Sequence, residues 1–367
     1  MRIAIVGCGY AADFYAITAP NHPLLEIIGV YDRVPERQQA FADYHGFKGY
    51  ESLDALLNDP AVEIVVNVTN PLSHAAVTRA ALMAGKHVYS EKPFALDLGE
   101  AKSLVELAKA RGLELGSAPC NLLSETAQTV WQAIRRGTIG TPRLAYAELD
   151  AGPLLRLPFQ KWVSSSGAPW PYHDELVTGC TIEHAGYYLT WLTAFFGPAT
   201  QVTAFASSIV PKGHLVADDS ELAPDFSVAC MTFADGVVGR VTTGISAPNN
   251  QSLRIIGDEG VLEVADGGHF GSPVSVTYDP EGGDPVELPL VRDTGRLAGL
   301  GDHHNYDFAR GVADFAAAVA GKDTSHLPTD HALHVLELTL TMANATEGVV
   351  AHPETTFAPV PPMPWAV

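Results

Sequence analysis

The first 120 residues alternate short apolar runs with amphipathic stretches. Five runs rich in β-branched side chains predict strands: Ile3–Val6, Glu26–Val30, Ile64–Val68, His87–Tyr89 and Leu113–Leu115. Between them, apolar positions recur at helical spacing in Pro35–Tyr44, Ser73–Ala84 and Asp97–Arg111. Strands that alternate with helices form right-handed βαβ units. This half is therefore predicted to be an α/β domain with a parallel sheet.

From about residue 143 the strand-like runs follow one another closely. They are Leu144–Leu149, Val202–Ser207, Ser227–Phe233, Val237–Thr243, Leu253–Gly257 and Gly260–Val264. Turn sequences such as Asp235-Gly236 separate them and favour hairpins. This half is predicted to be an α+β domain with a large, mainly antiparallel sheet. Because 367 residues are too many for one ordinary core, we expect two domains, over residues 1–120 and 121–367.

Some segments of the second half have a different character. Residues 151–173 are rich in Pro, Trp and Ser and predict a long ordered loop, and a helix is predicted over Glu183–Phe196. Residues 211–225 and 279–300 are predicted to be mobile surface segments.

A glycine-rich turn joins the first predicted strand to the following helix. Its residues Gly7, Cys8, Gly9, Tyr10, Ala11 and Ala12 give the pattern G-x-G-x-x-A. Gly7 permits the tight turn, Gly9 lets a pyrophosphate approach the backbone, and Ala12 keeps the helix close to the sheet. The N-terminus of that helix also favours phosphate charge. This context predicts a dinucleotide-binding Rossmann fold.

Residues at the end of the second strand indicate which dinucleotide, NAD or NADP, the site favours. Asp32 lies where a carboxylate can accept hydrogen bonds from both hydroxyls of the adenosine ribose, which favours NAD. Arg33 and Arg37 stand beside it and could instead accept the 2′-phosphate of NADP. We predict NAD as the cofactor, with NADP as the alternative.

Other polar residues follow the remaining strands of the predicted parallel sheet. They are Thr69, Asn70, Glu91, Lys92 and Asn121. The carboxyl ends of such strands meet at one crevice, so these residues are expected to contact the cofactor. An ammonium at Lys92 could also hydrogen-bond a substrate hydroxyl and stabilise the alkoxide that develops during hydride transfer.

Composition narrows the range of partners and the compartment. With 22 basic and 42 acidic side chains the net charge is −20, which disfavours nucleic acids and anionic membranes. The chain opens on a strand-like run and contains no apolar span of transmembrane length, so we expect a cytoplasmic protein. The four cysteines form no C-x-x-C pair and are predicted to be buried small hydrophobes. No metal is expected, because the pairs His303-His304 and His331-x-x-His334 lack further ligands of suitable spacing.

With these residues in place, the chain resembles the glucose–fructose oxidoreductase, inositol dehydrogenase and MocA family. Three segments carry the resemblance: Gly7–Ala12, the run from Thr69 through His74 to Pro93, and Gly179–Gly197. The resemblance implies a Rossmann domain, an open-faced antiparallel sheet and a bound NAD(P). It also implies that His74 belongs to the cofactor site and that the substrates are sugars, nucleotide sugars or cyclitols.

The third segment departs from the family pattern of an acid followed four residues later by a histidine. In the alignment without gaps, Glu183 takes the acid position and Tyr187 the histidine position. A phenol beside Lys92 can relay a proton as an imidazole would, and Lys92 is expected to lower its pKa. A second register would instead make His184 the relay, with Cys180 beside it.

An arginine that often follows the fifth strand in this family is missing. We expect Trp162, Trp170, Tyr172 and His173, just before the predicted helix, to contact the substrate in its place. Aromatic rings at such positions can stack on the apolar face of a sugar or cyclitol.

The expected function is reversible oxidation of a secondary alcohol by hydride transfer. Two alternatives stay open: an NAD-dependent glycosidase that oxidises C3 transiently, and a cofactor-dependent regulator without catalysis. The presence of Lys92 argues against the regulator. The resemblance also implies a homodimer or homotetramer.

Overall fold

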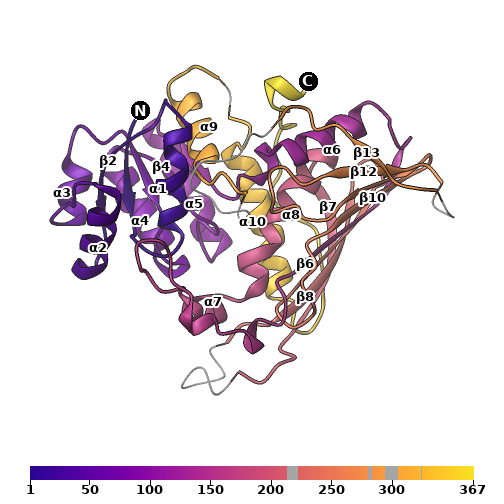
Figure 1. Cartoon of the computed structure of the whole chain (residues 1–367), viewed down its shortest axis with the longest axis horizontal. Helices are drawn as coiled ribbons and strands as arrows, with labels where there is room; N and C mark the ends of the chain where they lie inside the picture. Colours follow the sequence, from indigo (N-terminus) through magenta and orange to yellow (C-terminus); the bar gives the residue numbers. More distant parts are fainter. Residues whose placement is uncertain (213–221, 280–282, 294–304, 324) are drawn as a thin grey trace.

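The computed structural model describes residues 1–212, 222–279, 283–293, 305–323 and 325–367. It has two parts, a parallel sheet with helices on both faces and a larger sheet with helices on one face (Figure 1). The predicted fold class, an α/β Rossmann domain followed by an α+β domain, is confirmed.

The parallel sheet has the strand order β2-β1-β3-β4-β5. Its strands are β1 (Arg2–Val6), β2 (Glu26–Tyr31), β3 (Ile64–Asn67), β4 (His87–Ser90) and β5 (Leu115–Ser117). Four of the five predicted strands overlap these closely, whereas the fifth lies two residues further along the chain than predicted. All four residues of β3 are buried, because this central strand has helices over both of its faces.

The helices of this part are α1 (Ala12–Thr18), α2 (Pro35–His45), α3 (Leu53–Asn58), α4 (Pro71–Met83) and α5 (Leu98–Arg111). Local signals set their ends. The Asp97 side chain accepts a hydrogen bond from the Glu100 N–H at the start of α5, and Gly112 ends that helix in the left-handed conformation. The three helices predicted here are confirmed to within two residues at each end.

The larger sheet has nine strands in the order β13-β12-β11-β10-β6-β9-β8-β7-β14. The predicted strands appear as β6 (Pro142–Asp150), β7 (Ala199–Ser207), β8 (Phe226–Phe233), β9 (Val238–Gly244), β10 (Leu253–Gly257) and β11 (Val261–Val264). The others are β12 (Val274–Thr277), β13 (Val286–Leu288) and β14 (Val349–Ala351). All neighbouring pairs are antiparallel except β6 and β9, which run parallel.

Three helices pack on one face of this sheet: α6 (Glu125–Arg135), α8 (Cys180–Phe196) and α10 (Thr329–Ala343). The strands alternate accordingly, so that Ala145, Ala147 and Leu149 of β6 are buried beneath the helices. No described helix covers the opposite face, as Figure 1 shows. Phe205 and Val350 are exposed on that face.

The helices of the C-terminal half also complete the parallel sheet. Helix α9 (Ala309–Val319) packs beside α1 on one face through Val312 and Phe315. Helix α10 contributes Leu333 and Leu336 to the other face, beside α4 and α5. The two parts therefore share packed helices, an arrangement that the sequence pattern did not predict.

Three expectations for the second half need correction. Cys230 is exposed on β8, whereas the other three cysteines are buried as predicted. Within 211–225, which overlaps residues outside the described ranges, Lys212 and Asp225 form a buried ion pair in place of a mobile surface. Part of 279–300 also lies outside the described residues, but its described part contains β13.

Two further features concern histidines and membranes. His331 hydrogen-bonds Thr193 of α8, and His334 accepts a hydrogen bond from the Ala199 N–H, so both link α10 to its neighbours. His303 and His304 lie outside the described residues. Among the residues that the structure describes, no helix is long and apolar enough to cross a membrane.

Candidate active site

A cavity of about 470 Å³ lies at the carboxyl ends of the parallel strands. Most of the predicted cofactor residues line it together: Gly7, Gly9, Tyr10, Ala11, Asp32, Arg33, Arg37, Thr69, Asn70, His74, Glu91 and Lys92. We call this cavity the cofactor crevice. It is the place where the topology of an open α/β sheet concentrates ligand-binding groups.

The glycine-rich turn is shaped by close backbone contact. Gly7 has a φ of +97°, and a Cβ there would lie 2.5 Å from the carbonyl oxygen of Val68, which no side chain tolerates. A Cβ on Gly9 would meet no atom within 4 Å, so open space lies against that stretch of backbone. Cys8 and Ala12 are buried beneath the turn and do not line the crevice. The turn thus fits a pyrophosphate as the sequence analysis expected.

Asp32 is held in a fixed orientation beside the turn. Its carboxylate accepts hydrogen bonds of 2.8 Å from the N–H groups of Cys8 and Val34. Arg37 lies 3.7 Å from the same carboxylate. Each carboxylate oxygen keeps a free lone pair for a ribose hydroxyl. The acid and the turn therefore fit an NAD(P) dinucleotide.

Another wall of the cofactor crevice is built from hydrogen-bonded polar side chains. The ring nitrogens of His74 lie 2.8 and 2.7 Å from the carbonyl oxygens of Thr69 and Pro93, and burial lowers its pKa, so the neutral ring donates to one of them. Glu91 accepts a hydrogen bond of 2.7 Å from the Tyr15 hydroxyl. His74 thus lies between the ends of β3 and β4, and Glu91 ties the end of β4 to α1.

Asn121 does not join this wall. It is buried, and its amide donates to the backbone carbonyls of Tyr187 and Gly267. The structure therefore gives Asn121 a packing role behind the site, although sequence reasoning placed it with the cofactor residues.

Lys92 and Glu183 form an ion pair where the two parts of the molecule meet. The Lys92 Nζ lies 2.5 Å from a carboxylate oxygen of Glu183, the first acidic residue of α8. Burial lowers the pKa of Lys92, but the combined attraction of Glu183, Tyr187 and other nearby acidic groups outweighs it and holds the pKa well above the usual value. Lys92 is therefore an ammonium that lines the cofactor crevice.

Tyr187 lies one helical turn after Glu183, near the same ammonium. The Lys92 Nζ is 5.8 Å from the centre of the Tyr187 ring, which meets Tyr306 edge-on. Burial raises the pKa of the Tyr187 phenol, and the opposing attraction of Lys92 is weaker. Lys92 lowers this pKa as expected, but desolvation dominates, so the net shift of the Tyr187 pKa is upward.

His184 faces a different space. It lines a second cavity of about 230 Å³, and its Nδ1 is buried without a hydrogen-bond partner. Burial, followed by repulsion from Lys92, lowers the pKa of His184 to about 4, so the imidazole is neutral at physiological pH. Tyr187 lines neither cavity.

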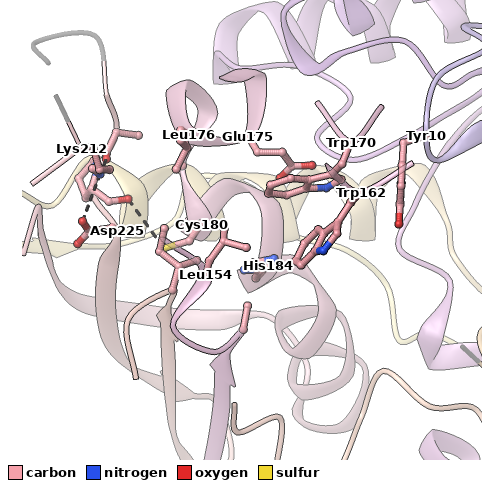
Figure 2. Close-up of a pocket in the computed structure, with 15 residues that line it drawn as sticks. Tyr10, Leu154, Trp162, Trp170, Glu175, Leu176, Cys180, His184, Lys212 and Asp225 are labelled. Carbon is pink, nitrogen blue, oxygen red and sulfur yellow. Dashed lines mark hydrogen bonds and ion pairs between the residues drawn. The ribbon is translucent and has the colours of Figure 1, made fainter. Parts of the chain in front are cut away.

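The predicted substrate residues separate into two groups. Trp162 and Trp170 line the second cavity, as Figure 2 shows. Tyr172 instead packs edge-on against Phe159, with ring centres 5.3 Å apart, and the His173 side chain is 59% exposed. Loop residues 151–171 position the tryptophans through two 3-10 turns, and the Ser166 hydroxyl anchors the loop to Asp13 of α1.

Sequence reasoning missed Glu175, which lines both cavities. It lies on α7 (Tyr172–Thr178), the short helix before α8. Burial, and then the charge of Glu183, raise the pKa of Glu175 to about 8. Its position directly after the predicted loop was the signal available in the sequence.

Comparisons with known proteins agree with this arrangement. Residues 1–118 match the oxidoreductase family with an NAD-binding Rossmann fold, and residues 127–263 match the GFO/IDH/MocA C-terminal domain. The chain is 31% identical to trans-1,2-dihydrobenzene-1,2-diol dehydrogenase of Macaca fascicularis, over 46% of this chain and 51% of the relative. It is 32% identical to UDP-N-acetylglucosamine 3-dehydrogenase of Acidithiobacillus ferrooxidans, over 40% of this chain and 45% of the relative.

The similarity to these two relatives thus spans about half the length of each. Among solved structures, the 3-ketoreductase KijD10 of Actinomadura kijaniata, in complex with NADP and TDP-benzene, has the same fold. The comparison gives a TM-score of 0.74 at 21% identity and covers 93% of this chain and 96% of the KijD10 chain. The two domain matches together span most of the chain, which belongs to the GFO/IDH/MocA family of NAD(P)-dependent oxidoreductases.

Proposed function

We propose that this enzyme interconverts a secondary alcohol and a ketone on a sugar, nucleotide sugar or cyclitol by hydride transfer. The observation that carries the proposal is the Lys92–Glu183 ion pair, whose two residues both line the cofactor crevice. A bound nicotinamide would accept or deliver the hydride. Residues 1–120 would hold the cofactor, and residues 121–367 would supply most of the substrate site.

Each residue of the site would have a separate task. The Lys92 ammonium would donate a hydrogen bond to the reacting oxygen and stabilise the negative charge that develops there. Glu183 would orient that ammonium. Tyr187, whose ring centre lies 5.8 Å from the Lys92 Nζ, is the proposed proton relay. In the direction of reduction its phenol, kept protonated by its raised pKa, would donate a proton to the ketone oxygen, and in the reverse direction it would take that proton back.

The relatives support a cyclic alcohol as the substrate without selecting one. One is named for a dihydrobenzenediol, one for a nucleotide sugar, and a third from Ensifer adhaerens for 1,5-anhydro-D-fructose. All three names describe oxidation or reduction on a ring. For the cofactor, the fixed carboxylate of Asp32 supports NAD, while Arg33 and Arg37 leave NADP as the alternative.

The oligomeric state belongs to the same proposal. The uncovered face of the large sheet, with Phe205 and Val350 exposed, would receive a second copy in a homodimer or homotetramer. Analytical ultracentrifugation of the purified chain tests this, since a purely monomeric species at micromolar concentration would contradict it.

The test of the activity compares two lysine variants. Lys92→Met should lower kcat at least 10²-fold while the affinity for NAD, measured by calorimetry, stays within about twofold. Lys102→Met is the matched control, because Lys102 makes only an exposed ion pair with Glu354 and should leave kcat unchanged. Unchanged turnover by Lys92→Met would contradict the proposal.

The stoichiometry of the cofactor separates the reaction classes. A dehydrogenase forms one NADH for each molecule of ketone produced. A glycosidase regenerates NAD in every cycle, so product without net NADH would favour that alternative.

A further inference from the structure

The second cavity has walls that are mainly apolar and aromatic. Its apolar residues include Leu154, Trp162, Trp170, Leu176 and Ile245, and we call it the tryptophan pocket. Trp162 and Trp170 have ring centres 5.3 Å apart, and Trp170 also packs edge-on against Phe159 at 5.9 Å. The two indoles are therefore held by their neighbours and present a preformed apolar surface.

The tryptophan pocket adjoins the place where hydride transfer would occur. Tyr10 and Glu175 line both this pocket and the cofactor crevice. In Figure 2, Tyr10 and the two tryptophans stand at one end of the pocket, His184 lies between, and the Lys212–Asp225 pair is at the other end. A ring that enters the pocket can thus extend one substituent past Tyr10 and Glu175 toward the cofactor crevice, which Lys92 lines.

The charged groups around the pocket are already paired. The Lys212 Nζ lies 3.3 Å from the Asp225 carboxylate and donates a hydrogen bond to the backbone carbonyl of Ala223. Asp225 accepts two further hydrogen bonds from the N–H groups of Ile209 and Val210. Lys92 is paired with Glu183 in the same way.

A phosphate or carboxylate in this pocket would have no unpaired cation among the described lining residues. Burying an anion without such a partner is strongly unfavourable. Glu175 gives no positive charge that could offset a bound anion. Its carboxyl holds its proton up to about pH 8, and above that pH it is a negative charge that would repel the anion. The electrostatics thus favour an uncharged ligand.

Hydrogen-bonding groups are few in the body of the pocket. The Lys212, Asp225 and Cys180 side chains already contact protein groups, and the Tyr10 hydroxyl and the Glu175 carboxyl belong to the residues that the pocket shares with the cofactor crevice. His184 offers a buried Nδ1 without a partner, and the neutral imidazole can exchange one hydrogen bond with a ligand there. A ring that carries hydroxyls on every carbon would leave several of them unsatisfied against the indoles and aliphatic side chains.

We infer that the tryptophan pocket selects uncharged ring alcohols with a mainly apolar body, such as alicyclic or hydroaromatic vicinal diols, over fully hydroxylated or phosphorylated rings. One hydroxyl would face Lys92 and the second would pair with His184. This inference rests on the proposed function for the identity of the reacting hydroxyl, and it narrows that proposal by excluding nucleotide sugars and fully hydroxylated sugars and cyclitols from the substrates. The selection itself depends only on the pocket.

The test measures binding without turnover, by calorimetry on protein saturated with NADH, which cannot accept a hydride from an alcohol. This protein is titrated with trans-cyclohexane-1,2-diol, myo-inositol and myo-inositol 1-phosphate, which share one ring and differ in hydroxyls and charge. The diol should bind at least about tenfold more tightly than myo-inositol, and the phosphate should bind most weakly. Equal or tighter binding of myo-inositol or its phosphate would overturn the inference.

Variants assign the binding to the pocket. Trp162→Ala and Trp170→Ala should each weaken diol binding by roughly tenfold, measured by calorimetry, because each removes apolar surface from the bound ring. Trp365→Ala is the control, since Trp365 packs on Arg292 and does not line the pocket, and it should change nothing. His184→Phe should reduce the affinity for the diol more than for cyclohexanol. Diol binding that survives both tryptophan variants would overturn the inference.

The two proposals fail in different ways. Diol binding that depends on the tryptophans, without formation of NADH, would support the pocket assignment and contradict the proposed function. Lys92-dependent oxidation of myo-inositol, with no binding of the diol, would support the proposed function and overturn the pocket assignment.

Discussion

Glu183 and His184 are consecutive on α8, yet they face different cavities. Glu183 lines the cofactor crevice and neutralises Lys92, whereas His184 lines the tryptophan pocket with an unpaired nitrogen. Consecutive helical residues point about 100° apart, so one short segment serves both spaces. The local geometry thus divides ion pairing and ligand contact between neighbours.

This division predicts different kinetic effects for Tyr187 and His184. Tyr187→Phe removes the proposed proton relay and should lower kcat by about 10²–10⁴-fold. His184→Asn removes only a contact in the tryptophan pocket and should raise KM while kcat falls much less. Steady-state kinetics on both variants check this. The opposite ranking would assign the relay to His184, in the register that places Cys180 beside it.

Asp32 carries the prediction for cofactor choice. Its carboxylate is fixed by two backbone N–H groups and would repel a 2′-phosphate, so the protein should bind NAD more tightly than NADP. Asp32→Ala should erode this preference and leave Arg33 and Arg37 to attract NADP. Calorimetry with both cofactors measures it. A wild-type protein that prefers NADP would show that the two arginines dominate the site.

At the scale of elements, the pattern of apolar residues predicted most of the fold. Strands and helices of the parallel sheet followed from local periodicity, and the glycine-rich turn placed the crevice correctly. The surroundings of Asn121, Tyr172 and Glu175 could not be predicted. Asn121 donates to the carbonyls of Tyr187 and Gly267, which are distant in sequence, and the places of Tyr172 and Glu175 depend on how the loop 151–171 and α7 fold. Burial also reversed the expected pKa shift of Tyr187, since desolvation is set by surroundings that one segment does not specify.

Helix α7 illustrates this dependence and carries a prediction about pH. It delivers Glu175 to a partly buried position near Glu183, where desolvation and that charge raise its pKa to about 8, whereas in the unfolded chain the carboxyl titrates near 4.5. Between these values the folded state holds a proton that the unfolded state releases. The free energy of unfolding should therefore fall as pH rises from about 4.5 to 8.

Glu175→Gln should remove this contribution. We subtract the unfolding free energy of wild type from that of the variant at each pH. This difference should be at least ~1 kcal/mol more positive at pH 8.5 than at pH 5.5. Urea unfolding at both pH values measures the difference. Glu106→Gln, at an exposed position on α5, is the control and should show no such change. The same pH dependence in wild type and Glu175→Gln would contradict the assignment.

At the scale of the whole molecule, a network of polar and charged side chains links the two parts. His22, in the first part, contacts Asp307 at 2.9 Å, and Arg310 of α9 lies 3.3 Å from the same carboxylate. Arg310 also donates to Glu125 of α6 at 2.9 Å. Since α9 packs on the parallel sheet and α6 on the large sheet, this network joins the layers that flank both cavities.

The last prediction follows from removing the centre of that network. Arg310→Met would leave the carboxylates of Asp307 and Glu125 buried with fewer partners, at a cost of about 3–5 kcal/mol in unfolding free energy. Arg143→Met removes an exposed pair with Asp258 and should cost less than ~1 kcal/mol. Adding Glu125→Gln to Arg310→Met should recover part of the loss, because it removes one of the uncompensated charges. Urea unfolding monitored by circular dichroism compares all three proteins with wild type. If Arg310→Met cost no more than Arg143→Met, the network would not be what holds the two parts together, and the apolar contacts of α9 and α10 would carry that role alone.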